Sequence, residues 1–113
     1  MDDSRALEDY MSAVRELPPL RREREAELLE AARAGDESSR RFAIEGLVEI
    51  SALLAIRYAP EGLRLIDAIQ EANVVLCRLV DDPKCPDPAL LLAPAIKERL
   101  EALQHGQPHR AGE

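Results

Sequence analysis

The chain has 113 residues, a length that allows one domain with a modest core. Its net charge of −7 argues against bulk binding of nucleic acid, because neutralising phosphate requires clustered lysine and arginine. Apolar residues make up 46% of it, and no apolar run approaches the roughly 20 residues that span a bilayer. The first ten residues lack the basic and apolar segments of a secretory signal, so we expect a cytoplasmic protein that does not bind membranes.

Two helices are predicted in the first third of the chain. The first begins at a polar cap, Asp3 or Ser4, and ends near Glu16, before two consecutive prolines that remove backbone donors. The second covers residues 21–34, where glutamate and arginine recur at helical spacing. Gly35 then supplies the residue for a left-handed helix cap.

The third predicted helix begins after Asp36 or Ser38, ends near Tyr58 and is the most apolar of all. Its wide apolar face predicts the central helix of a bundle. Two neighbouring stripes make up this face: Leu47, Ile50, Leu54 and Tyr58, and beside them Ile44, Val48 and Ala55.

The fourth predicted helix, residues 65–80, combines an apolar stripe with an unusual set of polar residues. The stripe expected in the core consists of Ile66, Ile69, Asn73, Leu76 and Val80. The opposite stripe consists of Asp67, Glu71, Val74 and Arg78, with Gln70 beside it. Taken alone, this pattern indicates a solvated polar face and one hydrogen-bonded asparagine in the core.

A last helical segment, residues 88–103, comes after a proline-rich loop, and we expect its main part to begin at Pro94, where proline is tolerated. Residues 104–113 show no pattern and predict a flexible tail, so that one domain covers residues 1–103. The expected fold class is all-α, a compact bundle of four to five helices, because the helix-favouring residues Ala, Leu, Glu and Arg dominate the composition.

No grouping of residues predicts an enzyme, a metal site or a cofactor. His105 and His109 fall in the predicted tail, and the sequence has neither a nucleophile–base grouping nor a glycine-rich phosphate loop. Cys77 and Cys85 are too few and too isolated for a zinc site or a disulfide framework, so we expect two reduced thiols, with Cys77 partly buried.

Four short segments stand out by their order and spacing. They are Tyr10-Met11 followed by LPPL at residues 17–20, AGDE at residues 34–37, AIRY at residues 55–58, and DAIQEAN at residues 67–73. In this order they resemble regions 1.2 to 2.2 of bacterial RNA polymerase sigma factors of the sigma-70 family. The last segment differs at only two positions from that family's Asp-Leu-Ile-Gln-Glu-Gly-Asn signature. The resemblance covers about residues 7–80, and the segment 88–103 diverges from the family.

The resemblance implies a fold like sigma factor domain 2 and a protein partner, core RNA polymerase. In the family the signature helix docks on the clamp helices, a basic coiled coil of the largest polymerase subunit. Carboxylates one turn apart, at Asp67 and Glu71, suit such a partner, because they accept charge-assisted hydrogen bonds from arginine. Carried over by position, the residues implied in docking are Ile66, Asp67, Gln70, Glu71, Asn73 and Cys77.

The chain also departs from the family in ways that bear on function. Glu49 stands where the family usually has arginine, and Ile56 where it has lysine. After Val80 the resemblance ends, and no aromatic residue occurs beyond Tyr58, although capturing promoter bases needs aromatic platforms among basic residues. We therefore expect a transcription regulator that binds polymerase, with or without another transcription factor, and has weak or no DNA binding of its own.

Two alternatives remain open from the sequence. The chain could be a diverged sigma fragment that serves as a protein-interaction or dimerisation module, with Leu90, Leu91 and Leu92 available to cover the bundle or to pair with a second copy. It could also be one part of a split sigma factor whose promoter-reading regions another chain supplies. The docking hypothesis requires Asp67, Gln70 and Glu71 at the surface, and the dimerisation hypothesis does not.

Overall fold

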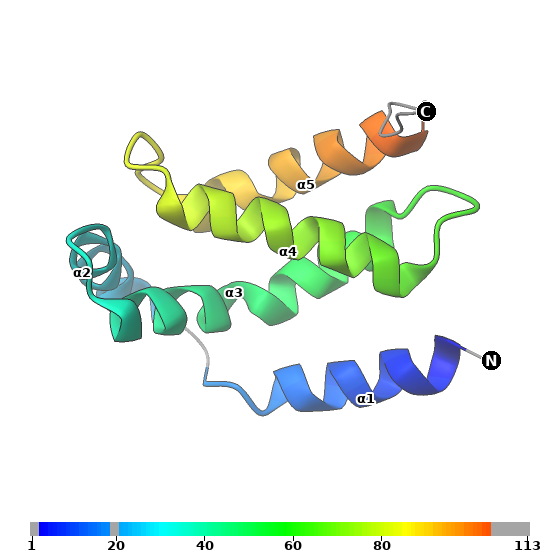
Figure 1. Ribbon diagram of the computed structural model, residues 1–113, viewed down its shortest axis with the longest axis horizontal. Coiled ribbons are helices and arrows are strands. Elements are labelled where there is room, and N and C mark those ends of the chain that lie inside the picture. The colour runs from blue at the N-terminus through cyan, green and yellow to red at the C-terminus, as the bar shows by residue number, and fades with distance from the viewer. Residues whose placement is uncertain (1–2, 19–20, 105–113) are drawn as a thin grey trace.

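The computed structural model describes residues 3–18 and 21–104, and this part of the chain forms five α-helices and no strand (Figure 1). The helices are α1 (Asp3–Arg15), α2 (Arg22–Arg33), α3 (Glu37–Tyr58), α4 (Leu65–Asp81) and α5 (Pro88–Gln104). The predicted all-α bundle is therefore confirmed. The predicted tail lies outside the described residues except for Gln104, which is the last residue of α5.

The longest helix, α3, is the centre of the bundle, as its wide apolar face predicts. It packs against each of the other four helices, and α4 and α5 also pack against each other. In Figure 1, α1 and α5 lie on opposite sides of the α3–α4 pair. None of the described helices is both long and apolar enough to cross a membrane.

The caps that separate α2 from α3 form as predicted. Gly35 has a φ of +107°, and its backbone N–H bonds the carbonyl of Ala32, while the N–H of Asp36 bonds that of Ala31. This pair of bonds satisfies the last carbonyls of α2 and defines a Schellman motif, in which glycine adopts the left-handed conformation without a steric penalty. The Asp36 carboxylate then accepts the N–H groups of Ser38 and Ser39 at the start of α3.

The buried face of α3 differs from the predicted stripe, because small residues occupy it. Leu47 is buried as expected, but the side chain of Ile50 is 50% exposed. The spacing between helix axes depends on the side chains at the contact, and alanine and serine allow the neighbouring helices to approach closely. The small residues buried on α3 are Ser39, Ala43, Ser51, Ala52 and Ala55.

The buried face of α4 shows the same shift toward small residues. The predicted core positions Ile69, Leu76 and Val80 are buried, whereas Ile66 is only half-buried. The remaining buried residues of α4 are Ala68 and Ala72. The polar residues that resemble the sigma signature lie on the opposite face of α4.

The last helix begins six residues before the expected position of its main part. Pro88 is its first residue, and the Asp87 carboxylate accepts the N–H of Leu90 as an N-terminal cap. Pro94 therefore lies inside α5, on its exposed side, and does not start it. Three fully buried side chains, Leu92, Ile96 and Leu100, hold α5 against α3 and α4.

Candidate functional site

The outer face of α4 presents the polar residues that the sequence singles out. Gln70, Val74 and Arg78 succeed each other at one residue per turn, and all three are exposed. Asp67 and Glu71 border this row and are partly exposed. Together, the five residues Asp67, Gln70, Glu71, Val74 and Arg78 form the outer face of α4. Its position opposite the buried alanines meets the first requirement of a docking site, which is accessibility.

Asp67 carries a weak local ion pair. Its carboxylate lies 3.6 Å from the guanidinium of Arg64, one turn earlier, and the two side chains are 44% and 61% exposed. A pair this open to water contributes little to stability and exchanges readily with another partner. The Asp67 carboxylate is therefore accessible to a cationic group on another protein.

Glu71 is held by the helix that has no counterpart in the sigma resemblance. The Nε of Arg99, on α5, donates a hydrogen bond of 2.9 Å to Oε1 of Glu71. The side chains of Arg99 and Glu71 are 40% and 36% exposed, so this contact lies at the edge of the outer face. Sequence reasoning did not find it, because the two residues are 28 positions apart and belong to separate helices.

Asn73 is engaged inside the bundle. Its Oδ1 accepts a 3.0 Å hydrogen bond from the hydroxyl of Ser51, and its Nδ2 donates a 2.9 Å bond to the phenolic oxygen of Tyr10. The amide thus connects α1, α3 and α4, and Ser51 is fully buried. The structure therefore places Asn73 as a half-buried residue at the junction of three helices, with both polar atoms of its amide hydrogen-bonded within the chain.

The remaining two predicted contact residues, Ile66 and Cys77, are half-buried at the side of α4.

Two arginines from other helices contact the C-terminal end of α4. Arg40 of α3 donates two hydrogen bonds, of 2.7 and 3.0 Å, to the carboxylate of Asp81. This contact lowers the pKa of Asp81 and raises that of Arg40. Arg33 also donates to the carbonyls of the last turn, so that two arginines stabilise the C-terminal end of α4.

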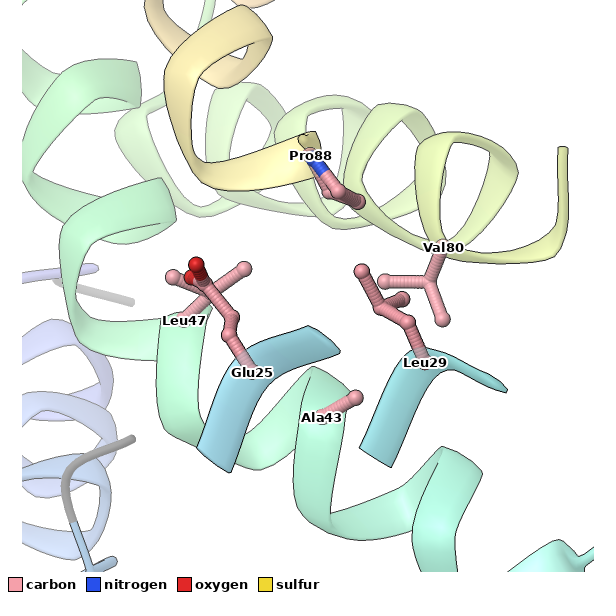
Figure 2. Close-up of a pocket in the computed structure, with 6 residues that line it drawn as sticks. All are labelled: Glu25, Leu29, Ala43, Leu47, Val80 and Pro88. Carbon is pink, nitrogen blue, oxygen red and sulfur yellow. The ribbon is translucent and has the colours of Figure 1, made fainter. Parts of the chain in front are cut away.

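A narrow apolar crevice lies where α2, α3, α4 and α5 meet, and Figure 2 shows its side chains converging from all four helices. It leaves no space for a water molecule. Glu25, buried at its edge, pairs with Arg22 at 2.6 Å, and Arg22 also bonds Asp87 at 3.1 Å. Burial raises the pKa of Glu25, whereas the bond from Arg22 lowers that of Asp87. The crevice is therefore a packing junction that anchors the start of α5. Its lining residues are Glu25, Leu29, Ala43, Leu47, Val80 and Pro88.

The chemistry of the described side chains centres on ion pairs and hydrogen bonds. Within residues 3–18 and 21–104, no group of three or more His, Cys, Asp and Glu residues could hold a metal ion. Cys77 and Cys85 are both free thiols, the first half-buried and the second buried. The outer face of α4 is the candidate functional site, and it presents two carboxylates, an amide and a guanidinium for polar contacts.

Comparison with known proteins indicates a distant relationship to a bacterial sigma factor. No family model matches the chain. Over 72 residues, 64% of its length, it is 31% identical to the RNA polymerase sigma factor SigA of Clostridium acetobutylicum, and these residues cover 19% of that protein. The chain therefore spans less than a fifth of the length of this curated relative. The match supports a distant sigma-70-like relationship.

Proposed function

We propose that the chain is a sigma-like transcription regulator that binds core RNA polymerase at the clamp helices of its largest subunit, without reading promoter DNA. The observation that carries the proposal is the surface position of Asp67, Gln70 and Glu71, the polar residues of the sigma-like signature. The sequence similarity to SigA supports the same function. Binding of polymerase would place the protein in the cytoplasm.

The chemistry of the outer face suits a basic protein surface. Asp67 and Glu71 are one turn apart and partly hydrated, so each can accept charge-assisted hydrogen bonds from arginine at a limited desolvation cost. Gln70 lies beside them and adds a neutral donor and acceptor. The net charge of −7 favours encounter with a cationic partner and opposes contact with DNA phosphates.

The segment after α4 lacks the side chains that promoter reading requires. A promoter-melting segment needs aromatic side chains on which bases stack, and the sequence has none after Tyr58. The apolar side of α5 is instead used in the core, through Leu92, Ile96 and Leu100. A chain that docks without melting DNA acts by occupying polymerase, either as a competitor of a sigma factor or as a tether, and the size of its effect is set by mass action.

A second candidate function has specific support. Asn73 is committed to Ser51 and Tyr10, and α3 exposes three large apolar side chains, Phe42, Ile50 and Leu53. Both features favour a diverged sigma fragment that uses another surface to bind a protein other than polymerase, or a second copy of itself. In that case the outer face of α4 would be inherited scaffold.

Titration of the purified chain against a clamp-helix fragment of the largest subunit tests the proposal. The variant Asp67→Ala/Gln70→Ala/Glu71→Ala removes the polar outer face, and the control Glu23→Ala/Glu30→Ala removes two negative charges from the exposed side of α2. We expect saturable binding by the wild type and the control and its loss in the triple variant. Absence of binding by folded wild-type protein would favour the second candidate.

A further inference from the structure

The contact between Arg99 and Glu71 joins the candidate docking face to the helix outside the sigma resemblance. Arg99 stands between two core residues of α5, since Ile96 and Leu100 are fully buried. The packing of α5 therefore fixes the backbone of Arg99 and holds its guanidinium next to the outer face of α4. The side chain of Arg99 can move away from Glu71 while α5 stays in place, whereas displacing α5 itself would expose the apolar core.

The geometry of the contact makes it exchangeable. One hydrogen bond, from Nε to Oε1, links the two side chains, although guanidinium and carboxylate can form two parallel bonds. Arg99 also borders a surface groove of about 370 Å³ between α4 and α5, whose lining includes Val75, Arg78 and Ala95. The open groove gives the Arg99 side chain space to move away from Glu71 without disturbing buried residues.

We infer that Arg99 competes with the partner for Glu71 and thereby sets the affinity and specificity of docking. This inference rests on the proposed function. A partner cation competes with Arg99 for the Glu71 carboxylate, and the positive charge of Arg99 repels that cation. A partner arginine that forms two bonds with the carboxylate displaces the single-bonded Arg99 more effectively than a lysine, which lacks the planar fork. The outer face thus selects a guanidinium-bearing protein surface.

The expected size of the effect depends on the exposure of the pair. Ion pairs open to water contribute little, so releasing Glu71 from Arg99 should strengthen binding by about two- to fivefold. The gain should shrink as salt concentration rises, because screening weakens exposed pairs.

The test compares Arg99→Gln with Lys97→Gln in titrations against the clamp-helix fragment. Lys97 lies on the same helix and pairs with Glu101 at 3.9 Å, so its replacement removes the same charge without touching Glu71. We expect Arg99→Gln to bind about two- to fivefold more tightly than Lys97→Gln, with both variants unfolding at similar temperatures. Adding Glu71→Gln should weaken binding more in the Arg99→Gln background than in the wild type.

The outcomes separate this inference from the proposed function. If the wild type binds but Arg99→Gln binds no more tightly than Lys97→Gln, the competition is overturned and docking through α4 stands. Weaker binding by Arg99→Gln would likewise overturn it and would assign Arg99 the role of orienting Glu71. If no folded variant binds the fragment, the inference fails together with the proposed function.

Discussion

Replacing Asn73 with alanine should destabilise the fold, because its amide connects three helices from the inside. The change leaves the hydroxyl of the fully buried Ser51 without its acceptor and removes the donor to Tyr10. An unsatisfied buried group costs about 1–3 kcal/mol, and a bond from Ser51 to a carbonyl in the preceding turn recovers part of that. A net loss of about 2 kcal/mol corresponds, in a domain of this size, to a fall of about 8 °C in the melting temperature.

Two companion variants identify the source of the loss. Tyr10→Phe should cost less, about 0.5–1 kcal/mol, because Tyr10 and Asn73 are both partly exposed and water can replace the lost contact. Adding Ser51→Ala to Asn73→Ala should recover stability, since the unsatisfied hydroxyl is then absent. Thermal unfolding followed by circular dichroism measures all four proteins. If Asn73→Ala melts within about 1 °C of the wild type, the amide is not engaged inside the bundle and is available to a partner.

Three further predictions concern α5 and the end of α4. Ile96→Ala should lower the free energy of unfolding in urea by about 2–5 kcal/mol, because the residue is fully buried, and a loss below about 1 kcal/mol would mean that α5 is not part of the core. Pro94→Ala should raise the free energy of unfolding by about 1–3 kcal/mol, because alanine restores a backbone donor inside α5. A lower free energy of unfolding would contradict a continuous helix through residue 94. Arg40 lowers the pKa of Asp81 below its ordinary value of 3.8, so the pair stabilises the fold above that pH and is lost in acid. Asp81→Asn should therefore be less stable than the wild type at neutral pH, and the difference should shrink as the pH falls below 3.8; a difference that stays constant in acid would refute the assignment.

Local signals in the sequence were sufficient to find the helices. The glycine and aspartate at residues 35 and 36 have the conformations and bonds that their types favour, and α3 ends at Tyr58 as predicted. The last helical segment begins at residue 88 as predicted, but its main part does not begin at Pro94, because Asp87 and Pro88 form the helix start and Pro94 is tolerated inside the helix.

Which side chains are buried depends on contacts between helices, and the periodicity of a single helix does not reveal those contacts. Ile50 was expected inside because it is apolar, but α3 and its neighbours approach through alanines and serines, so Ile50 faces outward. The surface position of Gln70 could be predicted from periodicity on one helix. The partners of Glu71 and Asn73 could not, since the contacts that decide their roles span 28 and 63 residues of sequence.

Site-specific photocrosslinking to core RNA polymerase tests the central claim most directly. A photoreactive residue at position 70 lies on the outer face of α4, and one at position 30 lies on the exposed side of α2. We predict crosslinks from position 70 to the clamp helices of the largest subunit and none from position 30. Crosslinks from position 30 alone, or none from position 70 at saturating polymerase, would contradict docking through α4.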